Sequence, residues 1–404
     1  MDLKSGYPYW AIRNGLMYAF PRLQQPLRCE VAVIGGGISG ALIADELASH
    51  GFDVAVIEQR DVGWGSSAAS TALLQYEIDT PMHELARRYG EADAARAYLA
   101  CAKAIARLQA VADELGDVDF AGMQSLYYAS RHHHVPAMRK ELALRLKHGF
   151  EASWLTPAAL QADYRIRAPG AILSRLGARV DPYRMAYRLF ARLQRRGSQV
   201  FDRTRIKHVQ AGPHGVELRT SEDLHVQADH VVFAVGYASQ RWLEQRVASN
   251  RSSYAFITDP LDAMELGPLR DTMVWESARP YLYLRSTGDG RLLVGGEDDA
   301  VDIPLRRDAR FNGKAGRLVR KVARAMPGLE LTPAFAWAGT FAETDDGLPF
   351  FGPHAQYGPR VLFAMAYGGN GITYSMLGAG LLRALIEQRP HPLAALFSFA
   401  RLDR

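Results

Sequence analysis

The sequence has very little cysteine and no long apolar stretch. Its 404 residues include only two cysteines, Cys29 and Cys101, which are not spaced as a CxxC pair or a zinc knuckle. A disulfide framework and a structural zinc site are therefore not expected, and both thiols are expected to be free and buried. No apolar run approaches the ~20 residues that cross a bilayer. The N-terminal stretch lacks the continuous apolar core of a secretory signal, so a cytoplasmic location is the default expectation.

The sequence also lacks a concentrated basic stripe. Lysine and arginine together number 48 against 43 acidic residues, and the resulting net charge of +5 is spread along the chain. Nucleic-acid binding requires denser basic clusters with interleaved aromatic residues, so no such partner is expected. The consecutive histidines of "RHHHVP" cannot converge on one ion, and no metal site is expected. An apolar content of 48% is ordinary for a globular protein, and the length suggests two domains or one large composite.

The strongest positive signal is the stretch "CEVAVIGGGISGALIADELASHGFDVAVIEQR", residues 29–60. An apolar, β-branched run predicts a buried parallel strand. Three glycines in G-x-G-x-x-G spacing follow the strand, helical spacing follows the glycines, and a second strand ends in an acidic residue. This strand, turn, helix and strand order is typical of a dinucleotide-binding unit.

Each residue of that motif has a physical role. Gly35 permits the tight turn, Gly37 lets the backbone approach a pyrophosphate, and Gly40 lets the helix pack closely on the strand. The helix N-terminus presents unpaired N–H groups to the phosphates. Glu58 can accept hydrogen bonds from ribose hydroxyls, and because it disfavours a 2′-phosphate, NAD and FAD remain as alternatives. The residues expected to bind the dinucleotide here are Gly35, Gly37, Ile38, Ser39, Gly40, Glu58, Gln59 and Arg60.

Two further features favour FAD. A long loop of small residues, "GWGSSAASTALLQ", follows the acidic residue and suits a flat, extended ligand. Later in the chain "VQADHVVFAVGYASQ" resumes the nucleotide-binding sheet after a long insertion, as in two-domain flavoenzymes. The loop residues expected to contact the ligand are Gly65, Ser66, Ser67, Ser70 and Thr71.

With these motifs the chain resembles the D-amino-acid oxidase (DAO) family of FAD-dependent oxidoreductases, which includes glycine oxidase and sarcosine oxidase. The resemblance is carried by "VIGGGISG…E", "GSSAASTALLQ", "ADHVVFAVGYAS", and "WAGTFAETDDGLPFFG" followed by "GGNGI". It implies an α/β (α+β composite) fold: a Rossmann-like FAD-binding domain with a parallel central sheet, and a substrate domain with a mixed, largely antiparallel sheet. The expected FAD-binding domain comprises residues 28–118, 175–245 and 335–404, the substrate domain 119–174 and 246–334, and an N-terminal extension, 1–27, packs on the body.

The resemblance also assigns residues around the flavin. A late strand, 360–367, leads into a second glycine-rich turn and a helix whose N-terminus would lie at the pyrimidine end of the ring. Because no cysteine follows Cys101, the FAD is expected to be noncovalent. The residues implied in these roles are Gly368, Gly369, Asn370, Gly371 and Ile372 at the turn, Leu73, Leu74 and Gln75 near the ring, Ile206 at the adenine, Gly236 near the phosphates, and Gly339 of the W-A-G motif.

The implied reaction is hydride transfer from a C–N bond of an amine or amino acid to flavin N5. Water then hydrolyses the imine, and oxygen or another acceptor reoxidises the flavin. The flavin carries this chemistry, so no catalytic acid–base pair is assigned. The alternative is a dehydrogenase that acts on a 2-hydroxy acid or another C–OH substrate. The sequence does not indicate the oligomeric state.

One departure from the family concerns the substrate carboxylate. Amino-acid oxidases of the family carry an arginine after W-A-G, where this chain has Phe341, and an apolar ring cannot pair with a carboxylate. Either Arg279 or Arg285 supplies the clamp, or the substrate is an amine without that carboxylate. The residues expected to line the amine site are Phe341, Tyr254, Tyr281 and Tyr283, with Glu343 to attract an ammonium group.

Overall fold

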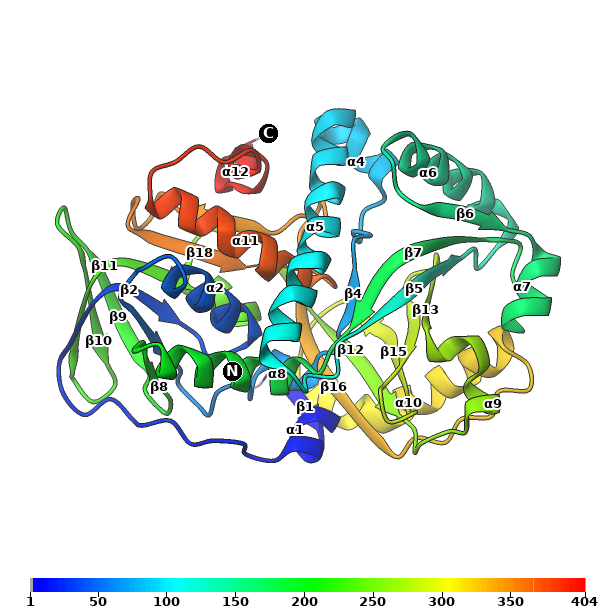
Figure 1. Cartoon of the computed structure of the whole chain (residues 1–404), viewed down its shortest axis with the longest axis horizontal. Helices are drawn as coiled ribbons and strands as arrows, with labels where there is room; N and C mark the ends of the chain where they lie inside the picture. Colours follow the sequence, from blue (N-terminus) through cyan, green and yellow to red (C-terminus); the bar gives the residue numbers. More distant parts are fainter. Residues whose placement is uncertain (1–2, 366, 404) are drawn as a thin grey trace.

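The computed structural model describes residues 3–365 and 367–403 of the chain. Two β-sheets lie on either side of the long helix α5 (Glu91–Leu115), which runs through the middle of the molecule (Figure 1). Helix α5 contacts helices of the smaller sheet and strands of the larger sheet, and it therefore lies at the junction of the two halves.

The smaller sheet has eight strands in the described part of the chain and is mostly parallel. Its β2–α2–β3 unit is the predicted dinucleotide-binding motif. The central strands are buried on both faces, which explains their continuous apolar sequences. In spatial order the strands are β17 (Phe350–Pro353), β18 (Val361–Met365), β11 (His225–Phe233), β2 (Leu27–Ile34), β3 (Val54–Ile57) and β8 (Gln199–Phe201), with β10 (Val216–Thr220) on β11 and β9 (Ile206–Ala211) on β10.

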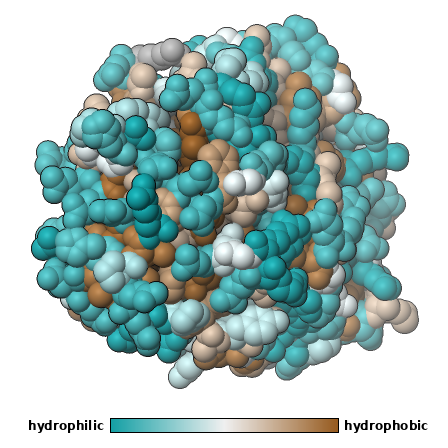
Figure 2. Space-filling view, turned by 60° about the vertical axis from the view of Figure 1, so that its left-hand side comes forward, coloured by the Kyte–Doolittle hydropathy of each residue, from teal (hydrophilic) through white to brown (hydrophobic). Residues whose placement is uncertain are grey.

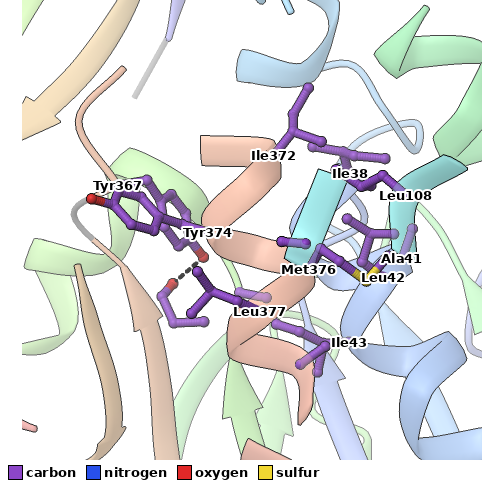
Figure 3. Close-up of a cluster of buried hydrophobic side chains, with 14 of the residues drawn as sticks. Ile38, Ala41, Leu42, Ile43, Leu108, Tyr367, Ile372, Tyr374, Met376 and Leu377 are labelled. Atoms are coloured by element: carbon purple, nitrogen blue, oxygen red, sulfur yellow. Dashed lines mark hydrogen bonds between the residues drawn. The ribbon is translucent and has the colours of Figure 1, made fainter. Parts of the chain in front are cut away.

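Three helices cover one face of the smaller sheet: α2 (Ile38–Ala48), α8 (Pro182–Arg195) and α11 (Gly371–Ile386). Figure 3 shows side chains of α2 and α11 packed together, with Leu108 of α5 beside them. The hydroxyls of Ser39 and Ser375 are 2.6 Å apart and join α2 to α11. The first and the last glycine-rich turns therefore open onto the same region, although they are far apart in the sequence.

The larger sheet has ten strands in the described residues and is mainly antiparallel, with β13 and β5 as a parallel pair. Between residues 246 and 334 the chain forms four successive strands, β12 to β15. In spatial order the strands are β1 (Lys4–Gly6), β16 (Phe335–Glu343), β12 (Ser249–Ile257), β15 (Leu292–Asp299), β14 (Leu282–Ser286), β13 (Thr272–Glu276), β5 (Ala121–Tyr128), β7 (Ala171–Arg179) and β4 (Leu73–Gln75), with β6 (Ala152–Leu155) on β7.

Helix α10 (Pro304–Ala325) covers one face of this sheet and contacts β12, β15 and β16. Its apolar side chains join a core formed with β13, β14 and β15. The remaining helices are α1 (Tyr9–Asn14), α3 (Ser66–Ala69), α4 (Met82–Tyr89), α6 (Val135–Lys147), α7 (Pro157–Tyr164), α9 (Ala263–Leu266) and α12 (Ala394–Phe397), with short 3₁₀ segments η1 (His132–His134), η2 (Gly236–Trp242), η3 (Gly267–Arg270) and η4 (Phe399–Asp403).

The sheets do not follow the domain boundaries expected from the sequence. Strands β4 and β16 and residues 175–179 of β7 were expected in the FAD-binding unit, but they belong to the larger sheet. The N-terminal extension adds β1 to β16 and buries Trp10. Strand β18 covers most of the predicted 360–367 strand, of which residue 366 lies outside the described residues. The two-domain division remains our proposal, with these strands at its boundary.

No helix in the described part of the chain is both long and apolar enough to span a membrane. The face drawn in Figure 2 is mainly hydrophilic, and hydrophobic residues show mostly in the gaps between polar side chains.

Candidate active site

A cavity of about 470 Å³ lies between the two sheets. It extends from β9 and the loop after β3, past both glycine-rich turns, to the aromatic side chains of β14 and β16. Its walls therefore contain residues from the first 80 and from the last 40 positions of the described chain. The predicted cofactor residues that line it are Gly35, Gly37, Ile38, Ser39, Glu58, Gln59, Arg60, Gly65, Ser66, Ser67, Ser70, Thr71, Leu73, Gln75, Ile206, Gly236, Gly339, Gly368, Gly369, Asn370, Gly371 and Ile372.

The first glycine turn is closely packed. Gly35 has φ +118°, a conformation that favours glycine, and a Cβ there would lie 2.4 Å from the carbonyl oxygen of Ala234. A Cβ on Gly40 would lie 1.9 Å from the carbonyl oxygen of Gly35. Gly40 does not line the cavity, so its effect on a ligand is indirect, through the approach of α2 to the turn.

Glu58 follows β3, and its carboxylate is held by backbone amides. The N–H of Gly36 donates to Oε2 at 2.7 Å and the N–H of Arg60 donates to Oε1 at 2.9 Å. Burial raises the pKa of Glu58, and these two hydrogen bonds oppose that rise. A carboxylate oxygen accepts about two hydrogen bonds, so both oxygens keep acceptor capacity toward the cavity.

Two tryptophan indoles form hydrogen bonds with the backbone of the small-residue loop. The indole of Trp10 donates to the carbonyl of Ser70 at 2.7 Å, and the indole of Trp337 donates to the carbonyl of Ala69 at 2.9 Å. The Ser67 hydroxyl accepts the N–H of Ile38 at 2.9 Å, which ties the loop to the start of α2.

Two polar atoms in this wall have no partner among the described residues. They are Ser66 Oγ and Arg60 Nε, both buried in residues that line the cavity. Unsatisfied buried polar atoms are rare in native proteins and point to a polar ligand. A serine hydroxyl and a guanidinium beside a helix N-terminus suit a pyrophosphate or ribityl chain, so this part of the cavity fits FAD.

The second glycine turn is attached to the segment after β4. The N–H of Gly369 donates to Asp79 Oδ2 at 2.8 Å, and the Asn370 side chain donates to the carbonyl of Glu77. A Cβ on Gly368 would lie 2.4 Å from Asp79 Oδ2. Helix α11 begins at Gly371, so its N-terminal amides border the cavity.

A buried ion-pair network lies behind this segment. Arg145 on α6 is fully buried and contacts Glu77 at 3.3 Å and Glu141 at 2.8 Å. Despite burial, Arg145 and hydrogen bonds from His83 lower the pKa of Glu141 to about 2. The network joins α4, α6 and the segment that holds Asn370.

The far end of the cavity is an aromatic chamber. Tyr281, Tyr283, Phe341 and Trp275 line it, so Phe341 stands in the cavity wall. The Tyr283 hydroxyl lies 3.2 Å from Ser253 Oγ, and burial raises the pKa of Tyr283 to about 12. The tyrosine therefore stays protonated near neutral pH.

Arg285 is not a carboxylate clamp, contrary to one of the two sequence-based alternatives. Its guanidinium is fully buried and donates to the carbonyls of Thr71, Ser286 and Val180. Since these bonds hold it away from the cavity wall, it supports the loop backbone and is not available to a substrate.

Tyr254 lines the cavity as predicted, but its hydroxyl is turned to α10, and Leu74 does not line the cavity. The Tyr254 hydroxyl donates to Asp299 at 2.7 Å, and Lys314 of α10 lies 4.9 Å from the ring, so the side chain faces α10. Leu74 belongs to the hydrophobic core, whereas Leu73 and Gln75 line the cavity. Adjacent strand residues point to opposite faces, and the sequence did not show which face was which.

Arg279 and Glu343 lie at the border of the chamber. Glu343 lines the cavity, and its carboxylate contacts Arg251 at 2.6 Å and Arg279 at 3.1 Å. Arg279 lines an adjoining polar pocket of about 300 Å³, stacks on Tyr281 and donates to the carbonyl of Asp79. Two arginines thus compensate the charge of Glu343, and the guanidinium of Arg279 already binds Glu343 and the carbonyl of Asp79.

Sequence reasoning missed several residues of the chamber: Asp79, Ser253, Trp275 and Asp298, together with Leu3 of the N-terminal segment. The stretch "GGEDD" at the end of β15 is a recognisable signal, because acidic residues after a glycine pair end an otherwise apolar strand. The others have no local signal, since ordinary strand residues become site residues only through the fold.

Comparison with known proteins agrees with this geometry. A family model described as FAD dependent oxidoreductase matches residues 30–385. Glycine oxidase of Geobacillus kaustophilus is 26% identical over 378 residues, which cover 90% of this chain and 94% of that one. Gamma-glutamylputrescine oxidoreductase of Escherichia coli is 24% identical over 94% of this chain and 88% of its own length.

The crystal structure of the Geobacillus glycine oxidase superposes with a TM-score of 0.76 at 21% identity and covers 93% of this chain and 99% of that one. This likeness shows the shared fold. The family match spans both sheets and both glycine-rich turns. The chain therefore belongs to the DAO family of FAD-dependent oxidoreductases.

Proposed function

We propose that this enzyme oxidises the C–N bond of a small amine or amino acid. The observation that carries the proposal is the continuity of the cavity, which joins the dinucleotide-binding turns to an aromatic chamber. Two relatives, a glycine oxidase and a gamma-glutamylputrescine oxidoreductase, bear names of the same reaction class.

The residues present would hold FAD along the cavity. The amides at the start of α2, with Ser66, Ser67 and Arg60, would bind its phosphates, and Glu58 would accept bonds from its ribose. The residues that would hold the ring end of FAD are Leu73, Gln75, Gly368, Gly369, Asn370, Gly371 and Ile372. Bound FAD supplies the two-electron oxidation, in which a C–N bond becomes an imine that water hydrolyses.

The protein's own contribution is placement and electrostatics. The 16-residue helix α11 directs its N-terminus at the ring end of the cavity, and such a terminus stabilises a nearby negative charge by roughly 0.3–1 kcal/mol. Asp79 and Glu77 fix the turn that starts this helix. The aromatic walls favour the apolar part of a substrate.

Anaerobic mixing of the FAD-loaded enzyme with candidate substrates tests the proposal. A panel of alkylamines and amino acids should bleach the flavin absorbance, and a matched panel of 2-hydroxy acids should leave it unchanged. Bleaching by the hydroxy acids alone would assign the enzyme to C–OH oxidation and refute the proposal. Oxygen consumption after each positive reaction then distinguishes an oxidase from a dehydrogenase.

A further inference from the structure

Charge is unevenly distributed along the cavity. Among the described lining residues, the cationic side chains belong to loops and strands of the smaller sheet. They are Arg60, Arg205, Lys207 and Arg241. Toward the chamber end the acidic lining residues are Glu77, Asp79, Asp298 and Glu343. The dinucleotide end therefore suits phosphates, and the chamber end does not suit a second anion.

Asp298 is the least neutralised of these four carboxylates, because Glu77 forms an ion pair with Arg145 at 3.3 Å. Glu343 contacts two arginines, and Asp79 accepts the N–H of Gly369. Asp298 forms no ion pair with a described residue, and its Oδ1 is buried without a hydrogen-bond partner. A buried carboxylate oxygen without a partner is costly, which points to a ligand that donates to it.

The backbone directs Asp298 into the cavity by an irregularity in β15. Gly296 has φ +133° and Glu297 has φ +56°, so two consecutive residues leave the usual strand conformation. Beyond this point Glu297 contacts Lys321 at 2.9 Å and Asp299 contacts Lys314 at 3.0 Å, both on α10, whereas Asp298 lines the cavity. Its neighbours in sequence thus have lysine partners that Asp298 lacks.

The chamber that Asp298 lines also has aromatic, uncharged walls. Tyr281, Tyr283, Trp275 and Phe341 line the same chamber. Burial raises the pKa of Tyr281 well above its ordinary value, so its hydroxyl is not an anion near neutral pH. Aromatic faces around a carboxylate form a site for an organic cation, because the ring quadrupole and the carboxylate both attract positive charge.

Resting on the function proposed above, we propose that the substrate binds as an organic cation with Asp298 as its counter-ion, and that it is an alkylamine or diamine without a carboxylate at this end. Phe341 offers no charge to a carboxylate, Arg285 is committed to backbone carbonyls, and Arg279 is held by Glu343 and Asp79. Among the described residues that line the chamber, a carboxylate would meet Asp298 and Asp79 and no uncommitted cation.

A binding experiment tests this without any turnover. The FAD-loaded enzyme is titrated with tetramethylammonium and, separately, with pivalate, an anion of similar shape, and binding is followed by the change in the flavin absorption spectrum. We expect tetramethylammonium to bind and pivalate not to bind. Asp298→Asn should weaken tetramethylammonium binding at least tenfold, and the exposed control Asp259→Asn should leave it unchanged.

The wild-type enzyme provides a second measurement if Asp298→Asn fails to retain FAD. Burial and the nearby Glu343 and Asp79 raise the pKa of Asp298 to about 6, and the Ser253 hydroxyl and the charge of Arg279 oppose the rise. The facing tyrosines, Tyr281 and Tyr283, stay neutral over this range. Tetramethylammonium affinity should therefore increase about tenfold between about pH 5 and pH 7, as the carboxyl ionises.

Several results would overturn the proposal. These are tighter binding of pivalate, no binding of tetramethylammonium, an affinity independent of pH, or an Asp298→Asn enzyme that binds the cation as the wild type does. None of these binding measurements requires that the enzyme oxidise a substrate. A cation that binds as expected in an enzyme whose flavin no amine bleaches would refute the reaction and leave the site intact.

Discussion

Replacing Gly40 with alanine tests how closely α2 must approach the first glycine turn. The added Cβ would lie 1.9 Å from the carbonyl oxygen of Gly35, about 1.5 Å short of ordinary contact at 3.4 Å. The obstacle is backbone and cannot rotate away as a side chain would. Helix α2 must therefore shift or the turn must open.

The expected magnitude follows from that displacement. Overpacking a closely packed site costs roughly 1–3 kcal/mol, so the free energy of unfolding of the apoprotein should fall by about 2 kcal/mol. Because the same shift moves the amides that we propose to bind the phosphates, FAD affinity should also fall by at least about tenfold, equivalent to ~1.4 kcal/mol. Urea unfolding and titration of flavin fluorescence measure the two quantities.

Gly313→Ala is the matched control. Gly313 lies in helix α10, where a Cβ would meet no atom within 4 Å. This substitution should stabilise the protein by roughly 0.5–1 kcal/mol through helix propensity and leave FAD affinity unchanged. If Gly40→Ala matched Gly313→Ala in stability and in FAD affinity, the close approach of α2 would have no role in the site.

Three further changes are expected to act through contacts outside the chamber. Trp10→Phe removes the indole N–H that supports the Ser70 carbonyl, and it should weaken FAD binding several-fold in a fluorescence titration; unchanged binding would contradict the bracing role. Glu141→Gln leaves the buried Arg145 guanidinium with less charge compensation and should lower the free energy of unfolding by roughly 3 kcal/mol, as urea denaturation would show. Because the pKa of Glu141 is depressed, its ionised carboxylate stabilises the fold above about pH 4.5, and this contribution is lost as the pH falls toward about 2. The free energy of unfolding of Glu141→Gln should therefore change less with pH over that window than that of the wild type. An equal pH dependence of the two proteins would refute the assignment. Tyr254→Phe should leave KM and kcat within about twofold of the wild type, because the lost hydroxyl faces α10 and not the substrate, and a large rise in KM would place the side chain in the chamber.

The dinucleotide half was accessible from the sequence because its signals are local. Gly35, Gly37 and Gly40 meet steric and phosphate requirements within a few residues, and the adjoining apolar runs form strands buried on both faces. The second glycine turn could be assigned to the same ligand through the family resemblance. The structure brings both turns onto one cavity.

The substrate half was less accessible because it depends on strand facing and register. Tyr254 and Arg285 looked suitable by position, but one faces α10 and the other is bound to backbone carbonyls. Asp298 reaches the cavity only because β15 changes conformation at Gly296 and Glu297. A shift of one residue in a strand moves side chains from the cavity face to the core face, and the spacing of residues in the sequence does not show such a shift.

The sequence by itself thus determined the fold class and the cofactor, through motifs that identify the family. It also predicted the residues at the phosphate end, because that prediction depends on short-range geometry and on closely packed glycines. Tertiary structure alone decided which arginines are free, which acids lack partners and where β16 and the N-terminal strand belong. Those outcomes depend on which distant groups meet. A charge's availability is a property of its neighbours, and they come from segments hundreds of residues apart.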